Sequence, residues 1–289
     1  TISNCSFGFG DDGFTLTVTN GLWIDAGGAL RLGTLGQVSN VTLQVGGGMV
    51  LTNGGSLHIY SGWTNTAPDY GALVSVGGDT LLSPGCWIYP YSQYTNGGSV
   101  RFNLGQVAVS TNAGFDASGR GYKGSFAGDG YGPGHGTKLG DRGSGGGYGG
   151  QGGVCEGNMA GGAAYDSSNA PTQAGSAGGR NGGGGGGSVQ IDAAGFTLDG
   201  SVVADGVDSP GGYDGAGSGG SIYIACGGFN GGTGGWLSAN GGSDTEGTQG
   251  GGGGGGRVVV WINAGRSLAD TLATQTNSPG VQELASLPD

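Results

Sequence analysis

One pattern of apolar residues and glycines occurs three times in the first third of the chain. Residues 15–32 align without a gap onto residues 42–59, at an offset of 27, and a third copy follows 31 residues later. Each copy holds three short runs in which apolar and polar residues alternate, separated by Gly or Asn, which predicts three short strands per copy. The matched positions are Leu16/Leu43/Val74, Val18/Val45/Val76, Ile24/Leu51/Leu82 and Leu30/Leu57/Ile88.

A single copy cannot bury its own apolar row, so successive copies must stack on one another. A unit of about 27 residues with three strands fits one turn of a parallel β-helix, whose stacked strands lie about 4.8 Å apart. The predicted fold class is therefore all-β, a parallel β-helix (β-solenoid). We expect Leu16, Leu43 and Val74 in an interior ladder. The residues expected to face water are Thr15, Thr17, Gln44 and Ser75.

The second half of the chain repeats in a different way. Strand-like runs follow double glycines at 188–191, 221–224 and 257–260, with an earlier relative at 99–102. A turn at 203–206 recurs at 238–241 and, more loosely, at 116–119. Each turn precedes a glycine-rich excursion, at about residues 119–187, 207–220 and 241–256. If these turns share one corner of the repeat, the excursions leave the solenoid on one side and lie next to one another.

Glycine supplies 78 of the 289 residues, so an important question is whether the glycine-rich excursions are flexible or ordered. One interpretation is flexible linkers, because glycine loses the most backbone entropy on ordering. The other is ordered, polyglycine-II-like packing, in which left-handed segments such as 182–187 and 250–256 exchange backbone hydrogen bonds. We favour ordered packing. Collagen is excluded because glycine does not occur at every third position and there are only 8 prolines.

The domain organisation that follows has four parts. We predict β-helix coils with a repeat of about 27–31 residues over residues 1–118 and a long glycine-rich excursion over 119–187. Further coils with glycine-rich loops are expected over 188–266. Residues 267–289 form a C-terminal tail without the glycine pattern.

The charge balance and the length of the apolar runs argue against nucleic acid as a partner and against a membrane-spanning helix. The chain has 9 basic and 20 acidic residues, a net charge of −11, so no basic patch suited to nucleic acid can be assembled. No run of 18 apolar residues is present, so we expect no membrane-spanning helix.

The four cysteines, Cys5, Cys86, Cys155 and Cys226, lie 81, 69 and 71 residues apart. This spacing differs from the close pairs of zinc sites and favours disulfides in an oxidising compartment. Three pairings are open, and four buried thiols are the alternative.

The glycine-rich segments carry a resemblance. The strings GSGGGYGGQGG at 143–153, GAGSGGSIYI at 215–224, LSANGG at 237–242 and GGGGGGR at 251–257 are similar to those of large glycine-rich bacterial surface proteins. These proteins contain parallel β-helix, autotransporter-passenger-like regions. The resemblance spans about residues 98–262 and implies a secreted, cell-surface protein, and it supplies no catalytic residue.

The sequence offers little catalytic chemistry. His58 alternates outward on a strand and His135 lies in a Gly-Pro-Gly-His-Gly loop, and neither has an evident partner. The G-x-G-x-x-G match at 119–124 is expected by chance in so glycine-rich a segment. Calcium is the one cofactor candidate, through Asp11/Asp12, Asp205/Asp208 and Asp214, although solubilising surface charge explains these acids better. We therefore predict no enzyme and no cofactor.

One loop could bind a ligand. Four basic residues, Arg120, Lys123, Lys138 and Arg142, fall in the long excursion together with three tyrosines. Cations and aromatic rings could form a sugar-binding surface, with a purely structural loop as the alternative. The candidate ligand-binding residues are Tyr122, Lys123, Tyr131 and Tyr148.

The ends of a β-helix present unpaired strand edges, which pair readily with another chain. No amphipathic capping-helix pattern precedes Phe14 or follows Ile262, so we expect a longer solenoid or end-to-end stacking into a filament. The predicted assembly edges are Phe14, Leu16, Val18, Val258, Val260 and Ile262.

The sequence thus predicts a non-enzymatic extracellular structural protein, a subunit or segment of a self-assembling surface filament, sheath or stalk, with itself as partner. A carbohydrate- or host-binding adhesin passenger, with a polysaccharide partner, is the alternative. A polysaccharide-degrading β-helix enzyme is less favoured.

Overall fold

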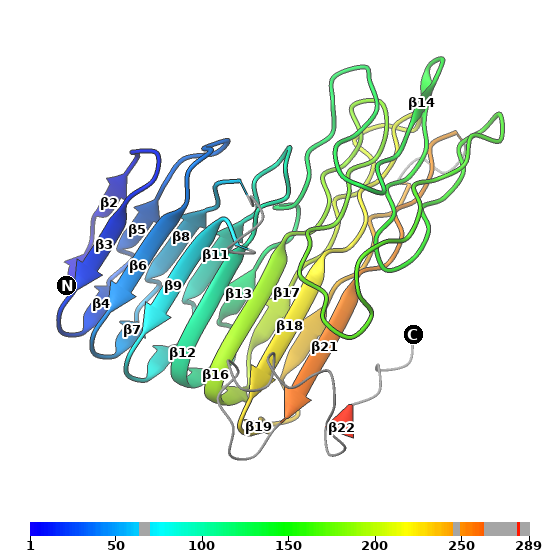
Figure 1. The fold of residues 1–289 in the computed structure, drawn as a ribbon. Helices are drawn as coiled ribbons and strands as arrows, with labels where there is room; N and C mark the ends of the chain where they lie inside the picture. Colours follow the sequence, from blue (N-terminus) through cyan, green and yellow to red (C-terminus); the bar gives the residue numbers. More distant parts are fainter. Residues whose placement is uncertain (64–69, 245–248, 263–281, 284–289) are drawn as a thin grey trace.

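The computed structural model describes residues 1–63, 70–244, 249–262 and 282–283 (Figure 1). The described residues form strands, turns and irregular segments, and none of them is helical. No described segment is a helix long and apolar enough to cross a membrane. The protein is all-β, as expected. Of the predicted tail 267–289, only residues 282–283 are described.

Two long sheets, in which nearly all pairings are parallel, contain almost all of the strands. The large sheet has 13 strands: β1 (Ile2–Ser3), β3 (Thr15–Val18), β4 (Leu22–Asp25), β6 (Val41–Val45), β7 (Met49–Leu51), β9 (Ala72–Val76), β10 (Thr80–Leu82), β12 (Val100–Val109), β16 (Ser188–Leu198), β18 (Ser221–Cys226), β19 (Phe229–Asn230), β21 (Arg257–Ile262) and the antiparallel β22 (Gln282–Glu283). The small sheet has 7: β2 (Ser6–Phe9), β5 (Ala29–Leu32), β8 (Ser56–Tyr60), β11 (Trp87–Tyr91), β13 (Gly114–Asp116), β17 (Ser201–Val203) and β20 (Trp236–Ser238). A separate hairpin joins β14 (Lys138–Leu139) to β15 (Arg142–Gly143).

The strand register confirms the repeat of the first half. In the large sheet Leu16 pairs with Leu43, and Leu43 pairs with Val74. In the small sheet Leu30 pairs with Leu57, and Leu57 with Ile88. The chain forms two strands of the large sheet and then one of the small sheet in each of these copies, so each copy lies over the one before it.

The register of the second half is confirmed as well. Ser188 pairs with Ser221, Ser221 pairs with Arg257, and Val100 of the earlier relative pairs with Val189. The copies of the recurring turn are also in register, because Val203 pairs with Ser238 and Asp116 pairs with Val203. The ladder therefore continues across the 119–187 excursion without a change of register.

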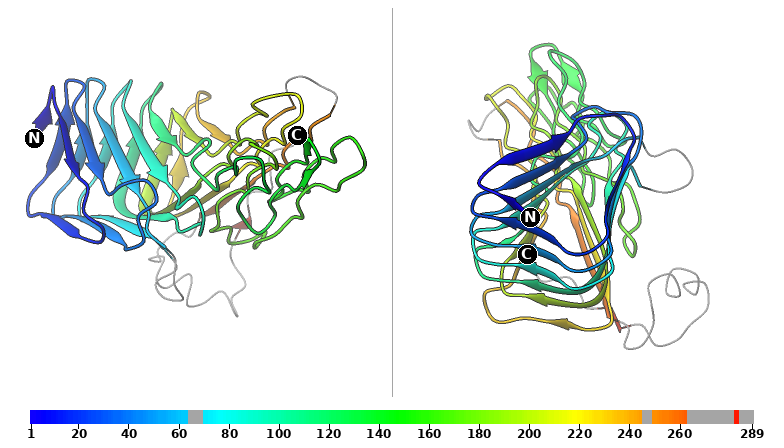
Figure 2. Two further views of the ribbon diagram at one scale, coloured as in Figure 1. Left: turned by 90° about the horizontal axis from the view of Figure 1, so that it is seen from above. Right: turned by 90° about the vertical axis from the view of Figure 1, so that its left-hand side faces the viewer.

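The hydrophobic core lies between the two sheets, which face one another when the molecule is viewed along its long axis (Figure 2). Leu43 and Val74 are fully buried, and Leu16 is half-buried because it lies on the first strand of its row. Phe102 on β12 meets Phe115 on β13 edge to face, with ring centroids 5.3 Å apart, and so joins the two sheets. Thr15, Thr17 and Gln44 are exposed and Ser75 is half-buried.

The glycine-rich excursions leave the sheets on one side and pack against one another at one end of the molecule (Figures 1 and 2). Bonds between the excursions confirm their adjacency: Ser218 donates its amide to the Ser176 carbonyl, and Gly242 donates to the Gly217 carbonyl. We call the packed segments the glycine bundle. It comprises residues 143–153, 174–187, 204–207, 214–220, 239–242 and 250–256.

Candidate functional site

The backbone hydrogen bonds of the glycine bundle follow a period of three residues. In the segment 215–220, amides three positions apart donate to the same neighbouring segment, and the three positions of each period serve three different neighbours. The bonds run from Gly215 and Ser218 to Gly179 and Ser176, from Ala216 and Gly219 to Gly251 and Gly254, and from Gly217 and Gly220 to Val207 and Ala204. This central segment is therefore hydrogen-bonded on three sides.

The backbone conformation of the bundle agrees with that period. Glycine populates positive φ as readily as negative φ. In the segments 175–179, 182–187, 215–220 and 250–256, however, no residue has a φ in the left-handed region, and the left-handed Arg180 and Asn181 lie between the first two segments. An extended helix with three residues per turn and no internal hydrogen bonds leaves all of its amides free for its neighbours.

Close packing explains why so many residues of the bundle interior are glycines. A Cβ on Gly217 would overlap the carbonyl oxygen of Gly184, and one on Gly253 would overlap that of Gly217. The buried residues that carry side chains there are mostly alanine and serine, such as the fully buried Ser176, Ser218 and Ala216, and the larger ones are Tyr148 and Asp214. Gly255 is different, because it is exposed and a Cβ there would meet nothing within 4 Å.

Two of the four predicted ligand-binding residues turn out to be structural. Tyr148 is fully buried and donates its hydroxyl to Asp166 Oδ2 at 2.6 Å, while its ring meets Tyr165 edge to face. Tyr122 is 6% exposed and donates to the Asn96 carbonyl at 2.9 Å. Burial raises the pKa of Tyr122 to about 12 and also raises the pKa of Tyr148. The prediction that both face a ligand is therefore wrong, because their hydroxyls are used inside the fold.

The other two predicted residues, Lys123 and Tyr131, line an open groove of about 790 Å³ where the glycine bundle meets the sheets. The Lys123 amide donates to the Tyr94 carbonyl at 3.1 Å, and the Tyr131 amide donates to the Lys123 carbonyl at 3.1 Å. The Lys123 ammonium lies 5.9 Å from the centre of the Tyr94 ring. These backbone bonds hold Tyr94, Lys123 and Tyr131 side by side.

Apolar and aromatic side chains form much of the rest of the groove, beside the polar Ser92, Ser125 and Asn181. Phe126, Leu35 and Val207 line it with 92%, 60% and 42% of their surfaces exposed. Tyr91 and Arg120 form the side nearest the small sheet. Sequence reasoning missed Tyr91, Tyr94, Leu35 and Phe126, because they come from separate segments that only the fold brings together.

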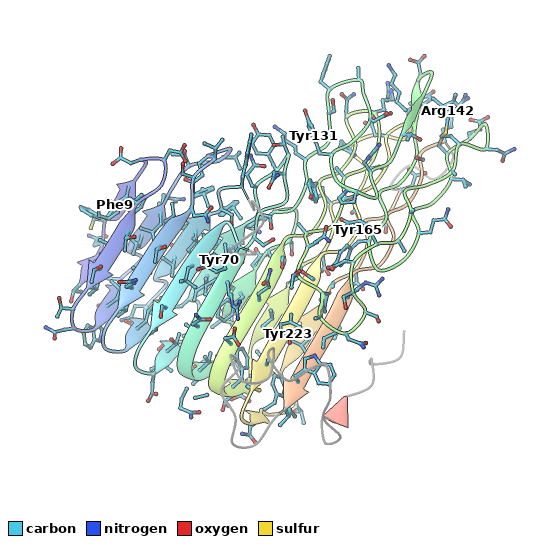
Figure 3. All side chains as sticks on the ribbon, in the orientation of Figure 1. Phe9, Tyr70, Tyr131, Arg142, Tyr165 and Tyr223 are labelled. Carbon is cyan, nitrogen blue, oxygen red and sulfur yellow. The ribbon has the colours of Figure 1, made fainter. Side chains whose placement is uncertain are left out.

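The four basic residues of the long excursion do not form one cluster. Figure 3 shows Tyr131 where the bundle meets the sheets and Arg142 at the outer end of the bundle. Arg142 pairs with Glu156 at 2.9 Å, and Lys138 lies on the exposed hairpin strand β14. Only Arg120 and Lys123 line the groove.

A stack of rings on the outer face of the small sheet supports one wall of the groove. His58 stacks on Tyr89 with ring centroids 4.7 Å apart, and Tyr60 stacks on Tyr91 at 4.3 Å. The Arg120 guanidinium carbon lies 4.7 Å from the Tyr89 ring centre and 5.0 Å from that of Tyr91. An ion pair with Asp116 at 3.1 Å also holds Arg120.

Both histidines are engaged in local structure. Burial, reinforced by the positive charges of Arg31 and Arg120, lowers the pKa of His58 to about 4. The imidazole is therefore neutral at pH 7, and the Tyr91 hydroxyl lies 3.5 Å from its Nδ1. His135 Nδ1 lies 2.8 Å from the Gly132 carbonyl oxygen within its own loop.

Four of the five acids considered for calcium have hydrogen-bond or ion-pair partners within the fold. Asp12 accepts the Val38 and Ser39 amides, and Asp205 accepts the Asn240 amide. Asp208 accepts the Ser243 amide, and Asp214 pairs with Arg180 at 2.6 Å. Among the residues that the structure describes, no three His, Cys, Asp or Glu side chains gather in a way that could hold a metal.

All four cysteines are free thiols, so none of the three candidate pairings forms. Cys5 is exposed, whereas Cys86, Cys155 and Cys226 are buried, as in the alternative of buried thiols. Burial raises the pKa of Cys226 to about 11, which keeps that thiol protonated.

The two predicted assembly edges differ from each other. At the N-terminal edge, β1, β2 and β3 each pair on one side only, and Phe14, Leu16 and Val18 are half-buried. At the other edge Val260 is buried and Val258 is half-buried. There β22 pairs with β21 at Trp261 and Ile262, so the edge at Ile262 is already occupied.

No protein-family model, curated protein or solved structure matches this chain.

Proposed function

We propose that this chain is a structural segment of an extracellular filament, sheath or stalk, without catalytic activity. In this proposal the parallel sheets wind as a β-solenoid, and the glycine bundle packs along it as left-handed, polyglycine-II-like segments. The observation that carries the proposal is the period of three in the bundle, in which the central segment donates hydrogen bonds to three neighbours. A large fraction of the chain is thereby committed to close backbone packing.

The physical properties of such an assembly suit a structural role. The sheets present continuous ladders, and their core rows are buried, as at Val41, Val100 and Ile224. Four ion pairs occur among the described side chains, so the ladders and the bundle depend little on charge and should tolerate salt. His58 and His135 have packing and loop contacts, which supports a role without acid–base chemistry.

Self-association is supported at the N-terminal edge. Strand β3 offers a row of unpaired backbone groups beside the half-buried Leu16 and Val18, and such an edge templates pairing with another chain. A second copy is the partner that this proposal commits to.

The test is sedimentation velocity and electron microscopy of the purified chain over a range of concentrations, at low and high salt. We expect multimers that persist in high salt. Leu16→Lys places a charge in the apolar row of β3 and should shift the population to monomers. Thr17→Lys is the matched control, because Thr17 is exposed on the same strand, and it should leave the multimers unchanged. Monomers at every concentration would overturn the proposal, provided that circular dichroism shows a folded chain.

A further inference from the structure

The groove at the junction of bundle and sheets is opposite in charge to the rest of the protein. The chain as a whole has 20 acidic and 9 basic residues. Among the described residues that line the groove, the charged ones are Arg120 and Lys123, and both are basic. Asp116 neutralises Arg120, whereas Lys123 forms no ion pair with any described side chain. The groove therefore offers one uncompensated positive charge.

The surfaces around that charge are aromatic rings and bare backbone. Tyr94, Tyr131 and Phe126 supply rings, and Gly182–Gly184 supply a wall without side chains. Exposed aromatic and apolar side chains that gather in one hollow are typical of ligand-binding sites. A tyrosine ring offers an apolar face and a polar hydroxyl, which match the C–H face and the hydroxyl groups of a pyranose ring.

We propose that this groove binds an acidic polysaccharide of the polyuronate class. The sugar rings lie against Tyr94 and Tyr131, and a uronate carboxylate accepts a hydrogen bond from the Lys123 ammonium. The groove is open to solvent. Phe126 and Leu35 then cover the apolar faces of neighbouring sugar units.

Two other anionic partners fit the groove less well. Nucleic acid binds through many phosphate contacts, and two basic residues supply too few. An acidic peptide would bind most readily by adding a strand to a free backbone edge. The amides of Gly121 and Gly183 on the groove wall are already donated to Gly185 and Gly215, so these positions offer no such edge.

The test is isothermal titration calorimetry of the full chain with tetragalacturonate, and with the carboxyl-reduced galactose tetramer as the neutral probe. We expect binding of the acidic probe that weakens as sodium chloride is raised, because the charge is exposed. Lys123→Gln should weaken binding about tenfold or more, since it removes a hydrogen bond to a charged group. Tyr131→Ala should weaken binding about tenfold, because it removes a ring that packs against the sugar.

The controls are chosen outside the groove. Lys138→Gln removes an exposed lysine on β14, and Tyr213→Ala removes an exposed tyrosine that does not line the groove. Both should bind as the unchanged chain does, and thermal melting confirms that all four variants fold. The proposal is overturned by no binding of the acidic probe, by equal binding of the neutral probe, or by equal losses in groove and control variants.

Discussion

Gly217 packs against the carbonyl oxygen of Gly184 so closely that a Cβ on Gly217 would overlap it. The Gly217 amide meanwhile donates to the Val207 carbonyl at 2.9 Å. The residue thus joins two neighbouring segments of the bundle, one by contact and one by a hydrogen bond. Many glycines of the bundle interior are in the same position, which is why the sequence contains so many of them.

Gly217→Ala should therefore destabilise the protein. The added methyl must push two backbones apart, and overpacking of a tight interior costs about 1–3 kcal/mol. The free energy of unfolding, measured by chemical denaturation, should fall by at least that amount. The methyl group would contact backbone atoms, and these can move aside less easily than a side chain can.

Gly255→Ala is the matched substitution in the same bundle. Gly255 is exposed, its φ lies outside the left-handed region, and a Cβ there meets nothing within 4 Å. The stability should stay the same or rise by about 0.4–1 kcal/mol, because alanine lowers the entropy of the unfolded chain. Equal losses in the Gly217 and Gly255 variants would contradict the packing described for the bundle.

Phe102→Ala tests the contact between the two sheets. Phe102 is fully buried and meets Phe115 across the core, so truncation should cost about 3–5 kcal/mol of unfolding free energy. Phe126→Ala, at a 92% exposed position, should change stability by less than about 0.5 kcal/mol. A small loss in the Phe102 variant would show that the sheets do not share this core.

The repeats were predictable because strand stacking leaves a direct trace in the sequence. Leu16, Leu43 and Val74 recur at the spacing at which their strands pair, and the double glycines before Ser188, Ser221 and Arg257 mark the same corner. A residue that faces the core in one copy must face it in the next, so alignment of the copies alone gives the register.

The groove could not be predicted in the same way, because its residues share no period. Tyr94 follows β11, whereas Lys123 and Tyr131 belong to the long excursion, and backbone bonds join them. The chain also gives no local sign that Tyr122 and Tyr148 are buried, since both lie among glycines. One signal was available: Tyr89 and Tyr91 stand 31 residues after His58 and Tyr60, which predicts the stacked rings.

His58 should titrate far below an ordinary histidine. Its pKa in the folded chain is about 4 against 6.5 for the free side chain, chiefly because it is partly buried. The unfolded chain takes up this proton as the pH falls below about 6.5, while the folded chain stays neutral until about pH 4. The stability that His58 contributes is therefore present above pH 6.5 and is lost between 6.5 and 4.

Proton NMR of the His58 ring measures that pKa directly. His58→Phe keeps an aromatic ring in the stack but removes the titration, so its stability should fall less between pH 7 and pH 4.5. A folded-state pKa near 6.5 would show that the ring is hydrated and not packed as described.

Tyr122 should give a loss of stability at alkaline pH. Burial raises its pKa from 10 to about 12, so the folded chain resists ionisation that the unfolded chain accepts. The contribution is complete below pH 10 and is lost as the pH rises from about 10 to 12. In Tyr122→Phe this part of the alkaline loss should disappear, as followed by denaturation at a series of pH values. An unchanged alkaline slope would contradict the burial of this hydroxyl.

Amide hydrogen exchange over residues 215–220 tests the ordered glycine bundle most directly, because all six of these amides donate to neighbouring segments. The account predicts that they exchange as slowly as the amides of the core strands β12 and β16. Exchange at the rate of unstructured glycine peptides would show that the bundle is not hydrogen-bonded, and would contradict the structural role proposed for it.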